Sequence, residues 1–102
     1  MNVSIRIAPH AAEQIRAAHD WWLINRTKAP DAFAEELERA LDLISTLPDA
    51  GEPVAHPDLA GIRRLQLGRI RYYLYYIKAA DSPVVDVLAL WHMSRGGQPP
   101  IA

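Results

Sequence analysis

Residues 61–77 read GIRRLQLGRIRYYLYYI, two strand-like runs on either side of Gly68. At the two-residue period of a β-strand, the second run places an apolar set on one face: Ile70, Tyr72, Leu74 and Tyr76. The opposite face is cationic and aromatic and carries Arg69, Arg71, Tyr73, Tyr75 and Ile77. Because glycine permits a tight reversal, the stretch predicts a β-hairpin with one face in the core and the other outside.

The charges of the chain are unevenly distributed. Residues 62–78 contain five Arg or Lys and no Asp or Glu, although the formal net charge of the 102 residues is only −1. The first 50 residues carry five basic and eight acidic side chains, whereas residues 51–102 carry six basic and four acidic ones. This asymmetry indicates a polyanion or an acidic partner for the second half, and an ordinary solvated surface is the alternative.

Upstream of this stretch, the patterns predict one strand and two helices. Residues 3–7 alternate between apolar and polar side chains, which is typical of a half-buried strand. A helix is expected from Pro9 to about Asn25, and a second one from about Pro30 to Leu47, where Pro48 ends it. Glu35 and Arg39 are spaced as an ion pair on the second helix, and its acidic residues are expected to face solvent. The short connection predicts an antiparallel helical hairpin packed on a sheet.

Downstream, the chain alternates loops with strands. Residues 48–61 hold three prolines and two glycines and predict a loop, and Val84 to Trp91 is apolar enough for a strand buried on both faces. Residues 1–95 are expected to form a single domain, followed by a flexible tail over residues 96–102. The chain has no cysteine, no signal-like segment and no membrane-length apolar run, so we expect a soluble, cytoplasmic protein without a membrane partner. No metal-spaced cluster or phosphate-binding loop occurs, and no metal or cofactor is expected.

Three motifs in this order carry a family resemblance: LPDAGEPV at residues 47–54, RRLQLGRIRYYLYY at 63–76 and VLALWHMSR at 87–95. Over roughly residues 3–95 the chain resembles the RelE/ParE superfamily of type II toxin–antitoxin toxins, also known as plasmid-stabilisation proteins. The resemblance implies an α+β fold with an N-terminal strand, an antiparallel helical hairpin and a three-strand antiparallel meander. The helices are expected to pack on one face of the sheet.

The resemblance also implies a function. Such toxins inhibit growth and are neutralised by a cognate antitoxin. They contact operator DNA only indirectly, through that antitoxin. ParE-like members inhibit DNA gyrase, whereas RelE-like members are metal-free, ribosome-dependent mRNA endonucleases. A third possibility is a decayed toxin that acts only in antitoxin binding and autoregulation.

Candidate site residues follow from the resemblance, position by position. For a nuclease they are Arg64, Arg71, His92 and Arg95. Gln66 stands where a strand lysine is expected and the C-terminal tyrosine of several nucleases is missing, so we favour the ParE-like branch and a non-enzymatic toxin. For binding of the target or antitoxin, the candidates are Arg63, Arg64, Arg69, Arg71, Tyr73, Tyr75 and His92.

Structural alternatives remain open for these residues. The strand arginines are also consistent with an ordinary surface, and Arg71 is also consistent with an internal ion pair with Asp86 across the meander. His92 is equally consistent with packing at the end of a strand. Aromatic residues are enriched in strands in any case, so Tyr73 and Tyr75 do not by themselves predict base stacking.

Overall fold

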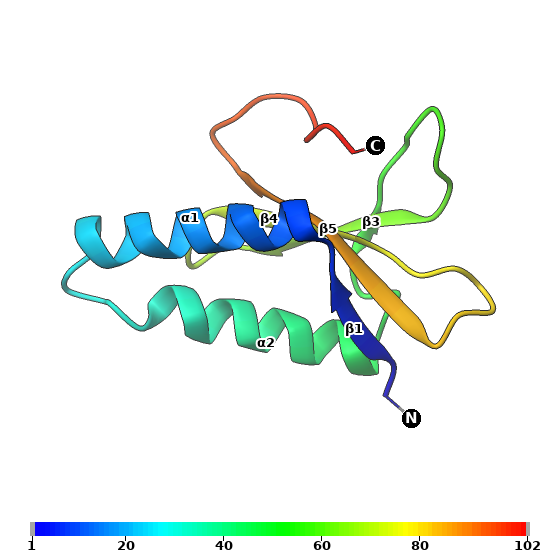
Figure 1. The fold of residues 1–102 in the computed structure, drawn as a ribbon, viewed down its shortest axis with the longest axis horizontal. Helices are drawn as coiled ribbons and strands as arrows, with labels where there is room; N and C mark the ends of the chain where they lie inside the picture. The colour runs from blue at the N-terminus through cyan, green and yellow to red at the C-terminus, as the bar shows by residue number, and fades with distance from the viewer. Residues whose placement is uncertain (1, 102) are drawn as a thin grey trace.

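The computed structural model describes residues 2–101, in which two helices cover one face of a five-stranded sheet (Figure 1). The elements in chain order are β1 (Ser4–Ile7), α1 (Pro9–Asn25), α2 (Ala32–Thr46), β2 (Glu52–Pro53), β3 (Ile62–Leu67), β4 (Tyr72–Ile77) and β5 (Val84–His92). The α+β class, the helical hairpin and the meander of β3, β4 and β5 are therefore confirmed. No helix within residues 2–101 is long and apolar enough to cross a membrane.

The strand order in the sheet is β1-β5-β4-β3-β2. The β1 strand pairs parallel to β5, with Ser4 opposite Val84 and Ile7 opposite Val87, and the other neighbours are antiparallel. The N-terminal strand therefore lies against the last strand of the meander. Because β1 is short, it covers only the first part of β5.

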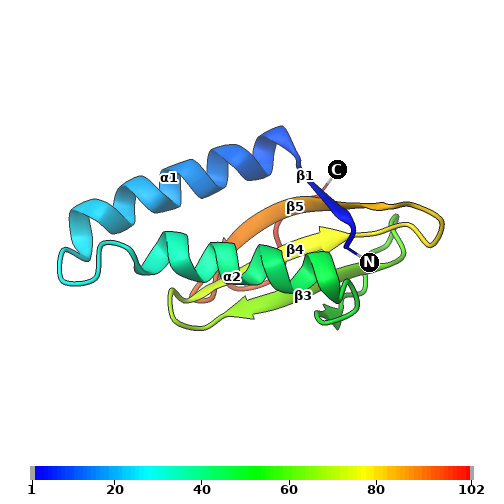
Figure 2. The same ribbon diagram turned by 90° about the horizontal axis from the view of Figure 1, so that it is seen from below.

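Both helices lie on the same side of the sheet (Figure 2). Pro9 occupies the first turn of α1, where its missing N–H leaves no hydrogen bond unmade. The stripe of α1 that meets the core includes Ala11, Ala18 and Trp22, and the indole Nε1 of Trp22 donates to the Ala29 carbonyl at 2.8 Å. This hydrogen bond fixes the connection between the helices.

A second, smaller core lies on the face of the sheet away from the helices. Its buried members are Ile62, Tyr75, Ala89 and Trp91, and the partly buried side chains packed on them include Val54, Leu59 and Ile101. The loop before β3 and the C-terminal segment therefore cover part of this face. The expectation that Tyr75 lies on an exposed face is wrong, because its side chain is fully buried.

The turn between β3 and β4 differs from the prediction. The strand begins at Tyr72 rather than at Arg69, and Ile70 is buried from within the turn. The residue with left-handed backbone is Arg71, with φ of 69°, and not Gly68. A four-residue turn therefore replaces the tight reversal at the glycine.

Two further segments are more structured than the sequence indicates. The predicted loop 48–61 contains β2, whose residues Glu52 and Pro53 pair with Arg64 and Arg63 of β3. In the predicted flexible tail, Pro99 is buried and Ile101 packs on the second core. Flexibility of the tail stays a prediction, and residue 102 lies outside the described residues.

Candidate functional site

The second face of the meander brings a cation, an amide and two aromatic rings together. In the antiparallel register, Arg64 is opposite Tyr75 and Gln66 is opposite Tyr73. Paired residues in an antiparallel sheet project to the same side, so these four side chains share one face. We call the surface formed by Arg64, Gln66 and Tyr73 the open face, because neither helix covers it; the Tyr75 side chain on the same side is buried.

Arg64 is held tightly on the open face. Its guanidinium donates to the Glu52 carboxylate and, at 3.4 Å, to the Tyr75 hydroxyl, and it lies 4.2 Å from the centroid of the Tyr73 ring. The hydrogen bonds to Tyr75 and Glu52 raise the pKa of Arg64, whose side chain is only 30% exposed. Arg64 is thus a fixed cation that contacts an aromatic ring and is partly neutralised by a carboxylate.

The LPDAGEPV motif places Glu52 beside Arg64. The buried Tyr76 hydroxyl donates to the Pro48 carbonyl and accepts from the Gly51 N–H, both at 2.8 Å, which ties the loop to β4. A Cβ on Gly51 would lie 2.7 Å from that hydroxyl and 2.8 Å from the Arg64 carbonyl, so only glycine fits. Burial is the main cause that raises the pKa of Tyr76. The sequence alone did not predict this anchor, whose signal in the chain is Gly51.

Arg63 belongs to this anchor and not to the open face. It lies opposite Tyr76, on the helix-covered side, and its guanidinium donates to the Gly51 carbonyl at 2.7 Å. Its Nε lies 3.6 Å from a carboxylate oxygen of Asp49. The two adjacent arginines therefore have different neighbours and point to opposite faces of the sheet.

Arg69 fastens the β3–β4 turn to α2. Its backbone N–H donates to the Glu36 carboxylate and its side chain to Glu35, both at 3.1 Å. Glu36 is 3% exposed and also accepts from Arg39. The expected pair of Glu35 with Arg39 and the solvated position of Glu36 are therefore wrong, because the turn reaches over and buries this carboxylate.

Arg71 is exposed in the same turn. The internal partner considered for it, Asp86, instead accepts two hydrogen bonds from Arg6 on β1, the shorter at 2.5 Å. Within residues 2–101, no ion pair involves the Arg71 side chain. Arg71 is consequently available to a partner, whereas the Arg6–Asp86 pair joins the two parallel strands.

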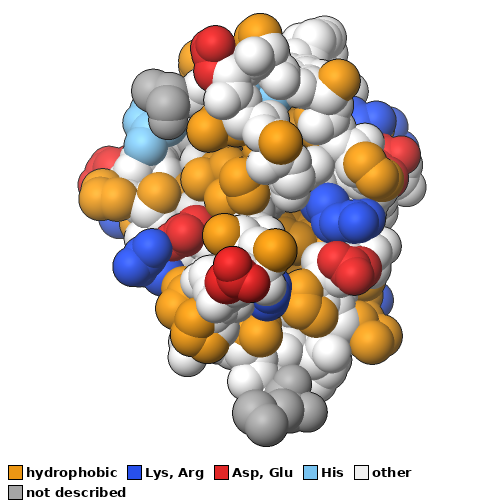
Figure 3. Space-filling view, turned by 90° about the vertical axis from the view of Figure 1, so that its right-hand side faces the viewer, with side chains coloured by type: hydrophobic (Ala, Val, Ile, Leu, Met, Phe, Trp, Pro, Cys, Tyr) orange, Lys and Arg blue, Asp and Glu red, His pale blue; other side chains and the backbone are white. Residues whose placement is uncertain are grey.

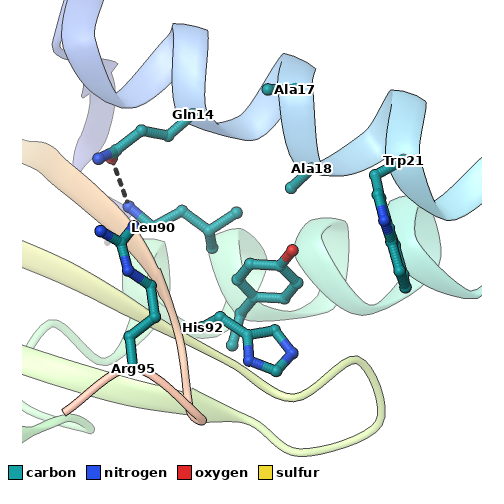
Figure 4. A pocket seen from close by; sticks show the side chains of 8 residues that line it. Gln14, Ala17, Ala18, Trp21, Leu90, His92 and Arg95 are labelled. Atoms are coloured by element: carbon teal, nitrogen blue, oxygen red, sulfur yellow. Dashed lines mark hydrogen bonds between the residues drawn. The ribbon is translucent and has the colours of Figure 1, made fainter.

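The remaining nuclease candidates lie elsewhere. His92 is opposite Tyr72 on the helix-covered side, with the two ring centroids 4.9 Å apart, and its Nδ1 accepts from the Ser94 N–H at 3.1 Å. Arg95 follows β5 and stacks on Trp91, with its guanidinium carbon 3.9 Å from the ring centroid. Of the four candidates, His92 and Arg95 line one cavity beside α1 (Figure 4), whereas Arg64 lies on the open face and Arg71 in the turn.

The cationic stretch is largely neutralised by carboxylates from other elements. Asp49, Glu52 and Glu35 pair with three of its arginines, Arg63, Arg64 and Arg69. At the end of the molecule shown in Figure 3, basic and acidic side chains likewise lie side by side among apolar ones. The charge asymmetry of the sequence therefore does not become an uninterrupted basic surface.

Residues 5–96 match the family model of the ParE toxin of type II toxin–antitoxin systems, parDE. A chromosomal ParDE toxin–antitoxin system from P. aeruginosa has a similar fold, with a TM-score of 0.71, 19% identity, and coverage of 90% of this chain and 97% of the other. The toxin–antitoxin complex RelBE2 from Mycobacterium tuberculosis matches with a TM-score of 0.64, 22% identity, and coverage of 90% and 99%. No curated protein sequence matches this chain significantly. The family match extends over most of the chain, and the chain therefore belongs to the ParE toxin family of type II toxin–antitoxin systems.

Proposed function

We propose that this toxin inhibits growth by binding DNA gyrase and that a cognate antitoxin neutralises it by covering the toxin surface. In this proposal the chain acts by protein binding and not by catalysis. A cytoplasmic location accompanies it, since gyrase acts on the bacterial chromosome. Contact with operator DNA is made only through the antitoxin.

The observation that carries the choice of a binding toxin over a nuclease is the separation of Arg64 from His92 and Arg95, which lie together in a cavity beside α1. Metal-free RNA cleavage needs a proton acceptor, a cationic clamp and a proton donor around one phosphate. Arg64 and His92 project to opposite faces of the sheet, and Arg64 is already engaged by Glu52. Gln66, beside Arg64 on the open face, is uncharged. These features favour protein recognition.

The antitoxin as partner is supported by the similar solved structures, which are a ParDE system and a RelBE2 complex. The open face and the adjoining turn offer the Tyr73 ring and exposed cations: among residues 2–101 the Arg71 side chain makes no ion pair, and the Arg69 side chain is 54% exposed. Such a surface fits an acidic or amphipathic segment. We therefore assign the open face and the turn to contacts with the antitoxin or gyrase.

Pulse labelling after induction of this chain alone tests the target. Thymidine incorporation is expected to fall first, with methionine incorporation initially intact. An earlier fall in methionine incorporation, with cleaved mRNA, would replace the proposal by the ribosome-dependent endonuclease. Normal growth without antitoxin would point to the decayed toxin.

Charge reversal in the turn tests the surface. Arg71→Glu is expected to weaken antitoxin affinity or toxicity about tenfold, because it places a carboxylate where the partner meets a cation. Arg16→Glu on the outer surface of α1 is the matched control, since among the described residues 2–101 Arg16 pairs only with Glu13 and Asp20 of its own helix. Equal effects of the two changes, or none, would remove Arg71 from the site.

A further inference from the structure

We propose that residues 96–101, which we call the strap, are displaceable, and that the surface beneath them, around the Trp91 indole, is a docking site for an extended segment of gyrase. The inference rests on the proposed inhibition of gyrase by binding. It adds where the target docks and what limits access to that place. Figure 1 shows the chain bending back after β5 into the strap.

The strap lies against the second core, on the same side of the sheet as the open face. The β5 strand places Trp91 opposite Tyr73 of β4. Pro99 in the strap is buried, and Ile101 packs on the cluster that contains Trp91. Tyr73 packs on the same cluster and also belongs to the open face. A segment that took the place of the strap would therefore meet the open face at the same time.

The strap is attached by apolar contacts. Among the residues that the structure describes, no hydrogen bond joins residues 96–101 to the strands or loops, and the last backbone hydrogen bond runs from the Arg95 N–H to the His92 carbonyl. Pro99 and Pro100 have no N–H to donate. Segments held by few apolar contacts open locally more easily than hydrogen-bonded elements do. Release of the strap therefore breaks no strand pairing.

Two glycines form a hinge between β5 and the apolar part of the strap. Gly97 has φ of 71°, in the left-handed region that glycine adopts without strain. A Cβ added at Gly96 or Gly97 would meet no atom within 4 Å, so the backbone there is unobstructed. The hinge allows residues 98–101 to swing away while β5 keeps its place.

The surface beneath the strap contains an unused hydrogen-bond donor. The Trp91 side chain is 8% exposed, and within residues 2–101 its indole Nε1 has no acceptor. Buried donors in folded proteins almost always have a partner, so the strap is an incomplete cover for this ring. A docked segment with a main-chain carbonyl at this position would supply the missing acceptor. Exchange of the strap for such a segment therefore gains a hydrogen bond.

The surroundings of Trp91 indicate the chemistry of the segment. The Arg95 guanidinium carbon lies 3.9 Å from the centroid of the Trp91 ring, and among the described residues Arg95 makes no ion pair. A fitting segment has an apolar side chain in the place of Ile101, with a carbonyl or carboxylate beside it for the indole and the guanidinium. A basic segment is disfavoured, since Arg64 and Arg95 are on this part of the molecule.

Hydrogen exchange of the Trp91 indole N–H, followed by NMR on the full chain, tests the strap and the site. Ile101→Ser is expected to speed this exchange about tenfold or more, because the strap is released. Ile24→Ser, at a 75% exposed position on α1, is the matched control and should leave the exchange rate unchanged.

The probe for docking is a synthetic peptide with the sequence of residues 96–101, GGQPPI, with an amidated C-terminus. Added to the Ile101→Ser chain, it is expected to slow the indole exchange again, whereas the same peptide with serine in place of isoleucine is not. Exchange that is insensitive to Ile101→Ser, or to GGQPPI, would overturn the inference and leave the proposed function standing.

DNA supercoiling by purified gyrase tests the occupant. Ile101→Ser is expected to inhibit at a concentration about threefold or more below that of the wild type, because a larger fraction of the chain is competent to bind, while Ile24→Ser stays within about twofold. An equal or higher inhibitory concentration for Ile101→Ser would contradict the proposal, as would a wild-type dimer that Ile101→Ser dissociates, since the occupant would then be the strap of a second copy. Unimpaired gyrase with every variant would instead refute the proposed function, and the choice of gyrase as occupant with it.

Discussion

The two faces of the sheet are built differently. The helix-covered face carries the main core, with Leu74 and Tyr76 of β4 packed under both helices. The open face has a smaller core, roofed by a loop and the C-terminal segment, and beside it a fixed arginine lies on an aromatic ring. The helix-covered face therefore contributes most to stability, whereas the open face carries the residues proposed for recognition. Substitutions on the two faces should consequently differ in how much they lower the free energy of unfolding.

The largest contrast is expected between matched apolar truncations. Leu74→Ala removes a fully buried side chain on the helix side and should lower the free energy of unfolding by about 2–5 kcal/mol, because it leaves a cavity. Ile101→Ala, in the partly buried roof of the open face, should cost about 1 kcal/mol. Denaturant unfolding measures both, and equal losses would contradict the difference between the faces.

The next effect concerns the buried carboxylate that ties the meander to α2. Glu36→Gln should destabilise the chain by about 1–3 kcal/mol, because the Arg69 N–H and Arg39 lose a charged acceptor. Glu38→Gln, on the exposed side of the same helix, should change stability by less than about 0.5 kcal/mol. Thermal unfolding of the pair checks this, and a wild-type Tm for Glu36→Gln would remove the proposed role of the carboxylate.

An effect of similar size is expected from the buried hydroxyl group of the loop anchor. Tyr76→Phe removes one donor and one acceptor from the buried loop anchor and should cost about 1–3 kcal/mol. Tyr73→Phe, on the open face, should be close to neutral, since among residues 2–101 its hydroxyl makes no hydrogen bond. Chemical denaturation distinguishes them, and an equal cost of the two changes would argue against the anchor.

The smallest expected effect is a pH dependence of the free energy of unfolding, which also arises from the Tyr76 hydroxyl. Because burial raises the pKa of Tyr76 in the folded chain above its ordinary value of 10.0, the folded state binds this proton more tightly than the unfolded state does. The corresponding stabilisation is complete below about pH 10 and is lost as the pH rises through the folded pKa. Stability measured between pH 9 and about 11.5 should therefore decline less steeply for Tyr76→Phe than for the wild type, and identical slopes would contradict this assignment.

Local periodicity was sufficient to predict most of the fold. Pro9 and Pro48 mark helix ends, and the apolar spacing of the two helices and three meander strands is unambiguous, so these elements appear where expected. The β2 strand was not predicted, because a strand of two residues is too short to show an alternation of apolar and polar side chains. The turn was misplaced because the left-handed conformation falls on Arg71, a residue type that rarely adopts it.

Less of the site was predictable, because its geometry depends on contacts distant in sequence. Alternation placed Tyr73 on the face opposite the core side of its strand, but the engagement of Arg64 by Glu52 depends on a loop whose path the sequence does not reveal. The side on which His92 lies follows from its pairing with Tyr72, which requires the register between β4 and β5. Burial of Tyr75 depends on the roof over the second core, which no local pattern indicates.

We propose that this ParE-family chain acts on gyrase by binding and not on mRNA by cleavage. The most direct measurement is DNA supercoiling by purified gyrase in the presence of the purified chain, with mRNA on translating ribosomes followed in parallel. Supercoiling is expected to be inhibited in proportion to the chain added, the antitoxin is expected to restore it, and the mRNA is expected to stay intact. Unimpaired gyrase together with mRNA cut in the ribosome would contradict it.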